Sequence, residues 1–124
     1  MAKIAFNWQD YIDFAQELLE KDISEKSLRS SVSRAYYGAF ICCRNRLGLS
    51  NRKDNEIHKI VCERFNSDNP TKEEMSIFNS LKDLRRFRNT ADYENFCDFT
   101  PQQVALIVDK SKNVISLLNS IELD

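Results

Sequence analysis

Two runs of the sequence combine arginine and tyrosine within helical periodicity. The first is residues 34–40, RAYYGAF, and the second is residues 84–93, LRRFRNTADY. Each run places arginine and tyrosine on or beside the helix face that we expect to be buried. An unpaired buried charge costs a large part of a domain's stability margin. These arginines are therefore either paired within the fold or used to bind a ligand.

Arg88 continues an apolar seam, because Leu81, Leu84, Arg88 and Ala91 follow one another at steps of three and four residues. Asp92 lies one helical turn beyond Arg88, within reach of an ion pair. One interpretation is therefore an Arg88–Asp92 pair that closes the end of the helix. The other is an arginine directed at a phosphate group and oriented by its neighbours. The spacing leaves both open.

A second side stripe runs along the earlier helix through Arg34, Tyr37, Ile41 and Arg44. Such residues are commonly solvated or bridge to another helix. Alternatively, arginine beside an aromatic ring makes a platform for nucleobases and phosphates. Tyr36, one position earlier than Tyr37, is expected in the core.

His58, the single histidine, precedes Cys62 by four residues on one helical face. A Cys–His nucleophile needs contact between the two side chains and a third group that orients the base. Only the spacing favours such a pair, so we expect a helix-surface or capping histidine.

The four cysteines show no CxxC spacing and are interpreted as free, small hydrophobic residues. No metal site and no cofactor are expected.

The net charge of −1 hides separated blocks of charge. Residues 29–53 contain six basic residues and no acidic one, and residues 82–88 contain four basic residues against Asp83. The first helical segment is acidic instead. This distribution argues against a polycation that coats DNA, and it is compatible with a local anion site built by the second and fourth helical segments.

The chain contains only two glycines and two prolines, too few for the turns of a β-sandwich or barrel. Helical periodicity instead predicts one domain, residues 1–124, folded as a compact all-α antiparallel up-and-down bundle of about five helices. The expected helices are 8–21, capped by Asn7, then 25–47, 55–65, a fourth opened by Thr71, and a fifth opened by Thr100. Gly38 indicates a close helix crossing and Gly48 a helix end.

No apolar run approaches the roughly 20 residues of a membrane span. The first residues are too short and polar a stretch for a signal peptide. We therefore expect a cytoplasmic protein with no membrane partner.

Three motifs, in order, resemble those of HEPN domains: residues 34–40, residues 57–65 beginning Ile-His-Lys-Ile-Val, and residues 84–93. The closest resemblance is to the small stand-alone prokaryotic branch, with its RAYYAAF-type second helix and LRxxRxxADY-type fourth helix. The resemblance covers about residues 8–121.

The resemblance implies a helical homodimer with a site in a cleft near the dimer interface, built from the fourth helix. Many HEPN proteins are metal-independent endoribonucleases of toxin–antitoxin and phage-defence systems. Stand-alone members often pair with a nucleotidyltransferase-like antitoxin.

The HEPN catalytic motif is an arginine followed a few residues later by a histidine. Arg88 and Asn89 match its first two positions, but Asp92 and Tyr93 stand where the histidine is expected. RNA cleavage needs a base, an acid and charge stabilisation. The resemblance makes Arg88, Asp92 and Tyr93 the candidate catalytic residues.

The site predicted to bind RNA or a nucleotide combines Arg88 and Asn89 with Arg34 and Tyr37, and ribonuclease activity is left open. The alternative is a non-enzymatic helical module that docks a nucleotidyltransferase-like protein.

Overall fold

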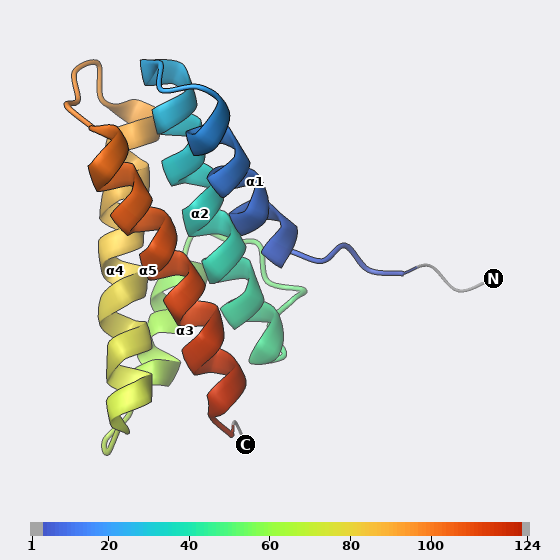
Figure 1. Ribbon diagram of the computed structural model, residues 1–124. Helices are drawn as coiled ribbons and strands as arrows, with labels where there is room; N and C mark the ends of the chain where they lie inside the picture. Colours follow the sequence, from blue (N-terminus) through green and yellow to red (C-terminus); the bar gives the residue numbers. More distant parts are fainter. Residues whose placement is uncertain (1–3, 123–124) are drawn as a thin grey trace.

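The computed structural model describes residues 4–122, which form five α-helices and no strand (Figure 1). The helices are α1 (Gln9–Lys21), α2 (Glu25–Arg46), α3 (Ile57–Phe65), α4 (Lys72–Tyr93) and α5 (Pro101–Ser120). The predicted all-α fold is confirmed.

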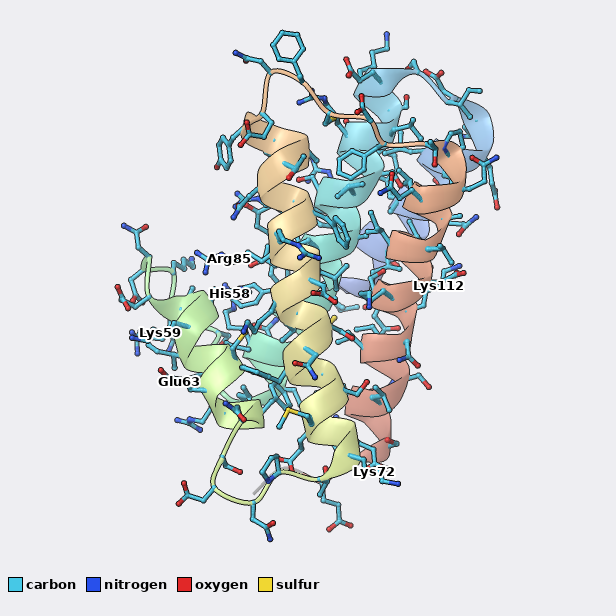
Figure 2. The ribbon with its side chains drawn as sticks, turned by 90° about the vertical axis from the view of Figure 1, so that its left-hand side faces the viewer. His58, Lys59, Glu63, Lys72, Arg85 and Lys112 are labelled. Atoms are coloured by element: carbon cyan, nitrogen blue, oxygen red, sulfur yellow. The ribbon has the colours of Figure 1, made fainter. Side chains whose placement is uncertain are left out.

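The long helix α2 lies at the centre and packs against all four other helices. The helices α1, α2, α4 and α5 run up and down beside one another (Figure 1). The short helix α3 covers one side of α2 and α4 only, and it stands apart from α5 (Figure 2). A crevice between α3 and α4 is therefore not covered by a further helix.

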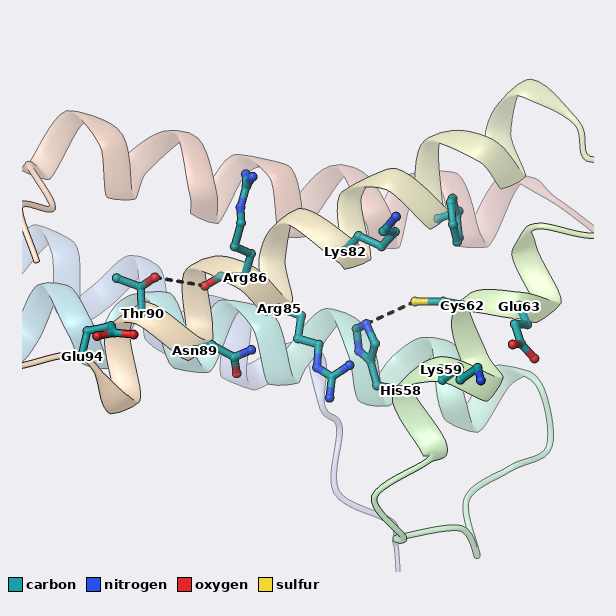
Figure 3. Close-up of a pocket in the computed structure, with 11 residues that line it drawn as sticks. His58, Lys59, Cys62, Glu63, Lys82, Arg85, Arg86, Asn89, Thr90 and Glu94 are labelled. Atoms are coloured by element: carbon teal, nitrogen blue, oxygen red, sulfur yellow. Dashed lines mark hydrogen bonds between the residues drawn. The ribbon is translucent and has the colours of Figure 1, made fainter.

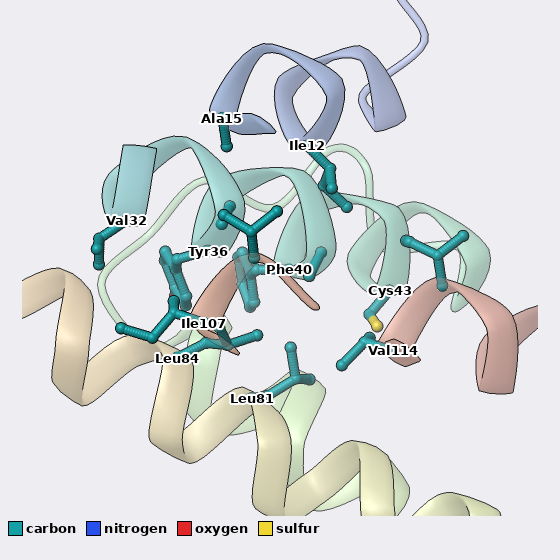
Figure 4. Close-up of a cluster of buried hydrophobic side chains, with 14 of the residues drawn as sticks. Ile12, Ala15, Val32, Tyr36, Phe40, Cys43, Leu81, Leu84, Ile107 and Val114 are labelled. Atoms are coloured by element: carbon teal, nitrogen blue, oxygen red, sulfur yellow. The ribbon is translucent and has the colours of Figure 1, made fainter. Parts of the chain in front are cut away.

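Buried apolar side chains from all five helices form one core cluster. Figure 4 shows members of this cluster from α1, α2, α4 and α5. On α4 the buried stripe comprises Ile77, Leu81, Leu84 and Ala91. Phe78 is half-buried: it packs against this core and also lines the crevice beside α3. Tyr36 is buried in the core, as predicted.

Within residues 4–122, none of the five helices has both the length and the apolar character needed to cross a membrane.

Most helix ends fall where the sequence places them. Thr71 and Thr100 each form a capping box, in which the threonine side chain and the side chain three residues on bond each other's backbone N–H groups. Gly48 follows the end of α2 with a φ of 76°, a left-handed conformation that favours glycine.

Two of the predicted helix starts are wrong. Helix α3 starts at Ile57 rather than residue 55, because residues 54–56 form a bend and turn that lead into it. Trp8, not Asn7, occupies the N-cap of α1. The Asn7 side chain still accepts a hydrogen bond from the Gln9 N–H, at 3.1 Å.

Gly38 lies where α1 and α2 cross. A Cβ atom added to Gly38 would lie 2.6 Å from Ile12 Cγ1 and 3.1 Å from the Trp8 carbonyl oxygen. The predicted close crossing is confirmed, and it accounts for a glycine in the middle of a long helix.

Two arginines of α2 serve as caps for other helices. Arg29 donates to the carbonyl oxygens of Ala91 and Glu94, at 3.1 and 2.6 Å, at the end of α4. Arg46 donates to the carbonyls of Leu118 and Ile121 at the end of α5. The last carbonyls of a helix have no partner within it, so these contacts stabilise the helix ends. Part of the positive block in residues 29–53 is therefore structural.

Candidate functional site

Arg88 is the centre of a polar cluster between α2 and α4. Its side chain is 17% exposed, and its Nε donates to Asp92 Oδ2 at 2.9 Å. Nη1 donates to Asn89 Oδ1 at 3.1 Å, and Nη2 donates to the hydroxyls of Tyr93, at 3.2 Å, and Tyr37. We call these five residues the Arg88 cluster.

Aromatic rings enclose the guanidinium group of Arg88. Its central carbon lies 4.9 Å from the ring centroid of Tyr37, 5.2 Å from that of Tyr93 and 5.8 Å from that of Tyr36. Burial lowers the pKa of Arg88, but the acidic groups of Tyr37, Tyr93 and Asp92 outweigh it and the pKa rises above its ordinary value. Arg88 is therefore a permanent cation held against three rings.

Most of the residues that the sequence analysis assigned to the site lie together in the structure. Arg88, Asn89, Asp92, Tyr93 and Tyr37 meet in one place. Arg34 does not bond to any of them within residues 4–122; its guanidinium lies 4.8 Å from the ring centroid of Tyr11 on α1 instead. Arg34 thus bridges α1 and α2, one of the two roles left open for it.

The ion pair expected between Arg88 and Asp92 is present. Every nitrogen of the Arg88 guanidinium has an acceptor within the chain, so a phosphate would have to compete with these partners. Asp92 also accepts from the Ser33 hydroxyl, at 3.2 Å. Its carboxylate is therefore positioned by two donors rather than left free as a base.

His58 is not a surface or capping residue, contrary to the prediction. It is 7% exposed, because the α3 face that carries it packs against Tyr36 and Phe40 of α2. Its Nδ1 lies 2.8 Å from the Tyr36 hydroxyl and its Nε2 lies 3.3 Å from Cys62 Sγ. The Cys–His contact that the spacing allowed is thus formed, and Tyr36 is the third group that orients the ring.

The protonation states argue against a nucleophilic cysteine in this trio. Burial raises the pKa of Cys62 to about 11. Burial also lowers the pKa of His58 to about 4, with the positive charges of Arg85 and Arg88 adding to the effect. Both side chains are neutral near pH 7, whereas a reactive thiolate needs a lowered thiol pKa.

A cavity with a volume of about 660 Å³ lies in the crevice between α3 and α4 (Figure 3). We call it the α3–α4 groove. Its α3 wall carries His58, Lys59, Cys62 and Glu63. Its α4 wall comprises Phe78, Lys82, Arg85, Arg86, Asn89, Thr90 and Glu94.

Four cations line this groove, and they differ in their partners. Arg86 reaches Asp83 at 3.5 Å and is mostly exposed. The Lys82 ammonium lies 5.0 Å from the ring centroid of Phe78. Arg85 takes part in none of the side-chain hydrogen bonds and ion pairs that α4 forms within residues 4–122, whereas residues on either side of it do. Arg85 points toward His58 at the groove (Figure 2, Figure 3).

The sequence contained a signal for this groove. Lys82, Arg85, Arg86 and Asn89 follow the helical spacing i, i+3, i+4 and i+7, so they share one face of α4. The predicted anion site paired the fourth helix with the second. The structure places the third helix opposite this face instead, because α3 packs beside α4.

The four cysteines are free; Cys43 and Cys62 are buried, and Cys42 and Cys97 are half-buried. Among residues 4–122, no group of three or more histidine, cysteine or acidic side chains is placed to hold a metal ion.

Comparisons with protein-family models, with curated proteins and with solved structures found no match to this chain.

Proposed function

We propose that this protein is a HEPN-type, cytoplasmic RNA-binding protein that holds single-stranded RNA, or a nucleotide, on the Arg88 cluster. The proposal combines the motif resemblance of residues 34–40 and 84–93 with the geometry of the cluster. The all-helical bundle agrees with the fold that the resemblance implies.

The observation that carries the proposal is the contact of the Arg88 guanidinium with two tyrosine rings, one of them exposed. The guanidinium carbon of Arg88 lies 4.9 Å from the ring centroid of Tyr37 and 5.2 Å from that of Tyr93, and Tyr93 is 70% exposed. Nucleobases stack on exposed aromatic rings with little sequence preference, each contributing about 1–3 kcal/mol. In this proposal Tyr93 stacks on a base, and the charge of Arg88 attracts the neighbouring phosphate. The hydrogen bond from Arg88 Nη2 to the Tyr93 hydroxyl holds Tyr93 in place.

The proposed role in RNA cleavage is weaker than the role in binding. Arg88 supplies charge stabilisation, but the two positions where HEPN enzymes carry histidine hold Asp92 and Tyr93. The only imidazole in the chain belongs to His58, whose ring nitrogens face Tyr36 and Cys62. We therefore expect slow cleavage or none.

Binding of a labelled single-stranded RNA tests the proposal, with the variant Tyr93→Ala. Loss of one stacked base, worth about 1–3 kcal/mol, weakens binding by roughly 5- to 150-fold. Phe14→Ala removes another exposed aromatic side chain, on α1, and is the matched control. Equal affinity of wild type and Tyr93→Ala would refute the proposed site, provided that both proteins are folded.

The proposal includes a homodimer. Phe96, which is 92% exposed, lies three residues beyond Tyr93 and supplies apolar surface for a second copy. A dimer is not needed to cover Arg88, because one chain already encloses it. Light scattering at micromolar concentration should give the mass of two chains, and a monomer mass would remove the dimer from the proposal.

The alternative function is docking of a nucleotidyltransferase-like antitoxin. Phe96 in the α4–α5 connection and Ile23 in the α1–α2 turn are both exposed, and both segments lie at the same end of the bundle (Figure 1). Absence of RNA binding by the wild-type protein, together with capture of such a partner, would favour this alternative.

A further inference from the structure

We propose that the α3–α4 groove is a second binding site, separate from the Arg88 cluster, for a small phosphomonoester whose organic part is planar and apolar. This site goes beyond the proposed RNA binding and does not depend on it. Four features of the groove support this ligand: its charge, the freedom of Arg85, its apolar surface and its size.

The charge of the lining favours a dianion. Lys59, Lys82, Arg85 and Arg86 face only two acidic lining residues, Glu63 and Glu94. A phosphomonoester carries a charge of about −1.5 to −2 near pH 7. The surplus of two cations therefore complements a phosphomonoester better than a singly charged carboxylate.

Arg85 is the residue best placed to bind the phosphate. Its guanidinium has no acceptor within residues 4–122, in contrast to Arg88 three positions later. Arginine presents a planar fork of N–H donors that matches two phosphate oxygens. A ligand here displaces no hydrogen bond of the protein to Arg85.

Two cations of α4 act on side chains of the α3 wall. Burial raises the pKa of the Cys62 thiol, the charges of Arg85 and Lys82 lower it, and Glu63 raises it by a smaller contribution. The charge of Arg85 also lowers the pKa of His58, in addition to the larger effect of burial. Two cations from α4 therefore reach the α3 wall, where an anion would be attracted.

The organic part of the ligand has an apolar surface to cover. Phe78, the Cys62 thiol and the neutral ring of His58 line the groove beside the cations. The Lys82 ammonium lies over the Phe78 ring and can turn on its flexible stem toward a phosphate. A volume of about 660 Å³ is in the range of small-molecule sites, roughly 300–1,000 Å³.

The groove and the Arg88 cluster lie on adjacent faces of α4. Asn89 is the single residue of the Arg88 cluster that also lines the groove, and its side-chain oxygen Oδ1 accepts a hydrogen bond from Arg88 Nη1. The two sites therefore allow independent tests with different variants.

Isothermal titration calorimetry of the full chain with phenyl phosphate tests the proposal. We expect one phenyl phosphate per chain, bound at least tenfold more tightly than inorganic phosphate. Arg85→Ala should weaken binding about 10- to 100-fold, the effect of losing one or more hydrogen bonds to a charged group. Glu63→Gln should strengthen binding, because it removes an acidic residue from the lining.

Arg64→Ala is the matched control, because Arg64 is an exposed arginine of α3 outside the groove. Arg64→Ala and Tyr93→Ala should both bind phenyl phosphate like the wild type. An effect of Arg64→Ala equal to that of Arg85→Ala would overturn the proposal. So would absence of phenyl phosphate binding by the folded wild type.

A phosphomonoester also occurs at the end of an RNA strand. Adenosine monophosphate and a short RNA with a 5′-phosphate distinguish the two sources. The proposal predicts that the mononucleotide binds the wild type and loses affinity in Arg85→Ala. If the 5′-phosphorylated RNA binds through Arg85 while phenyl phosphate and the mononucleotide do not, the groove is an RNA-end site and the proposal is wrong.

Discussion

Arg85 and Arg88 lie three residues apart on α4, but they face different neighbours and differ in their hydrogen bonds. Arg88 faces α2 and is held by Asp92, Asn89, Tyr37 and Tyr93. Arg85 faces the α3–α4 groove and bonds to none of the described residues around it. The helical spacing of an arginine determines which surface it faces. The partners on that surface determine whether the arginine stabilises the fold or binds a ligand.

The largest expected difference between the two arginines is in stability. Arg88→Ala removes a mostly buried cation and leaves the Tyr37 hydroxyl and Asp92 without their main partner, so it should lower the free energy of unfolding by about 2–4 kcal/mol. Arg85→Ala should lower it by less than about 1 kcal/mol, as is usual for a residue without such contacts. Urea denaturation of both variants measures the difference. Equal losses of unfolding free energy in the two variants would show that Arg85 and Arg88 do not differ in their contribution to stability.

His58 lies between the two regions, and its pKa predicts a dependence of stability on pH. The pKa is about 4 in the folded protein and 6.5 in the unfolded chain. Between these values the unfolded chain binds the proton and the folded protein does not, so stability falls as the pH drops from 6.5 to 4. The loss is about 3 kcal/mol at pH 4 and below.

The control for the pH dependence is His58→Gln, which removes the titrating group and keeps polar atoms near Tyr36 and Cys62. Carboxylates titrate in the same window in both proteins, so the relevant quantity is the difference between the two profiles from denaturation. Parallel profiles between pH 4 and 6.5 would contradict the lowered pKa of His58.

A smaller effect is expected at the α1–α2 crossing, which supports the α2 side of the Arg88 cluster. Gly38→Ala gains about 1 kcal/mol of helix propensity but places a methyl group against Ile12 and the Trp8 backbone. Overpacking typically costs about 1–3 kcal/mol, so we expect a net loss of up to about 2 kcal/mol in thermal denaturation. The groove between α3 and α4 is remote from this crossing, and phenyl phosphate binding should not change. A stabilised variant would show that α1 moves aside freely.

The smallest expected signal is a gain of RNA cleavage. Tyr93 Oη lies 3.2 Å from Arg88 Nη2, so a histidine at position 93 would stand beside the guanidinium. Because imidazole titrates near neutral pH, Tyr93→His should introduce slow cleavage of single-stranded RNA in the presence of a chelator. Asp92→His is the second variant, and the double variant Tyr93→His with Arg88→Lys is the control. Fast cleavage by the wild type, lost in Asp92→Asn, would show that the present residues are catalytic.

The fold was largely predictable because its signals are local. The capping boxes at Thr71 and Thr100, the glycine after α2 and the apolar stripes each depend on residues a few positions apart. The Arg88 cluster was predictable for the same reason, since Asn89, Asp92 and Tyr93 belong to the same helix. Tyr37 was included as a neighbour on the second helix.

The groove was not predicted, because it depends on which helices pack together. The face of α4 with Lys82 and Arg85 is readable from the sequence, but the position of α3 opposite it is a tertiary contact. His58 was placed on the surface since a nine-residue helix gives little periodicity, and its burial follows from packing against Phe40. Arg34 was grouped with Tyr37 by spacing, but Tyr11 on α1 provides its contact.

The most direct test of the contrast between Arg88 and Arg85 is to map two ligands on one protein. Backbone amide chemical shifts of the full chain should be recorded by NMR during separate titrations with single-stranded RNA that carries a 5′-hydroxyl and with phenyl phosphate. We predict that RNA shifts the amides of residues 88–93 and 34–37, whereas phenyl phosphate shifts those of residues 58–63 and 82–86. Shifts of one common set of residues by both ligands would contradict the account, since α4 would then carry a single site.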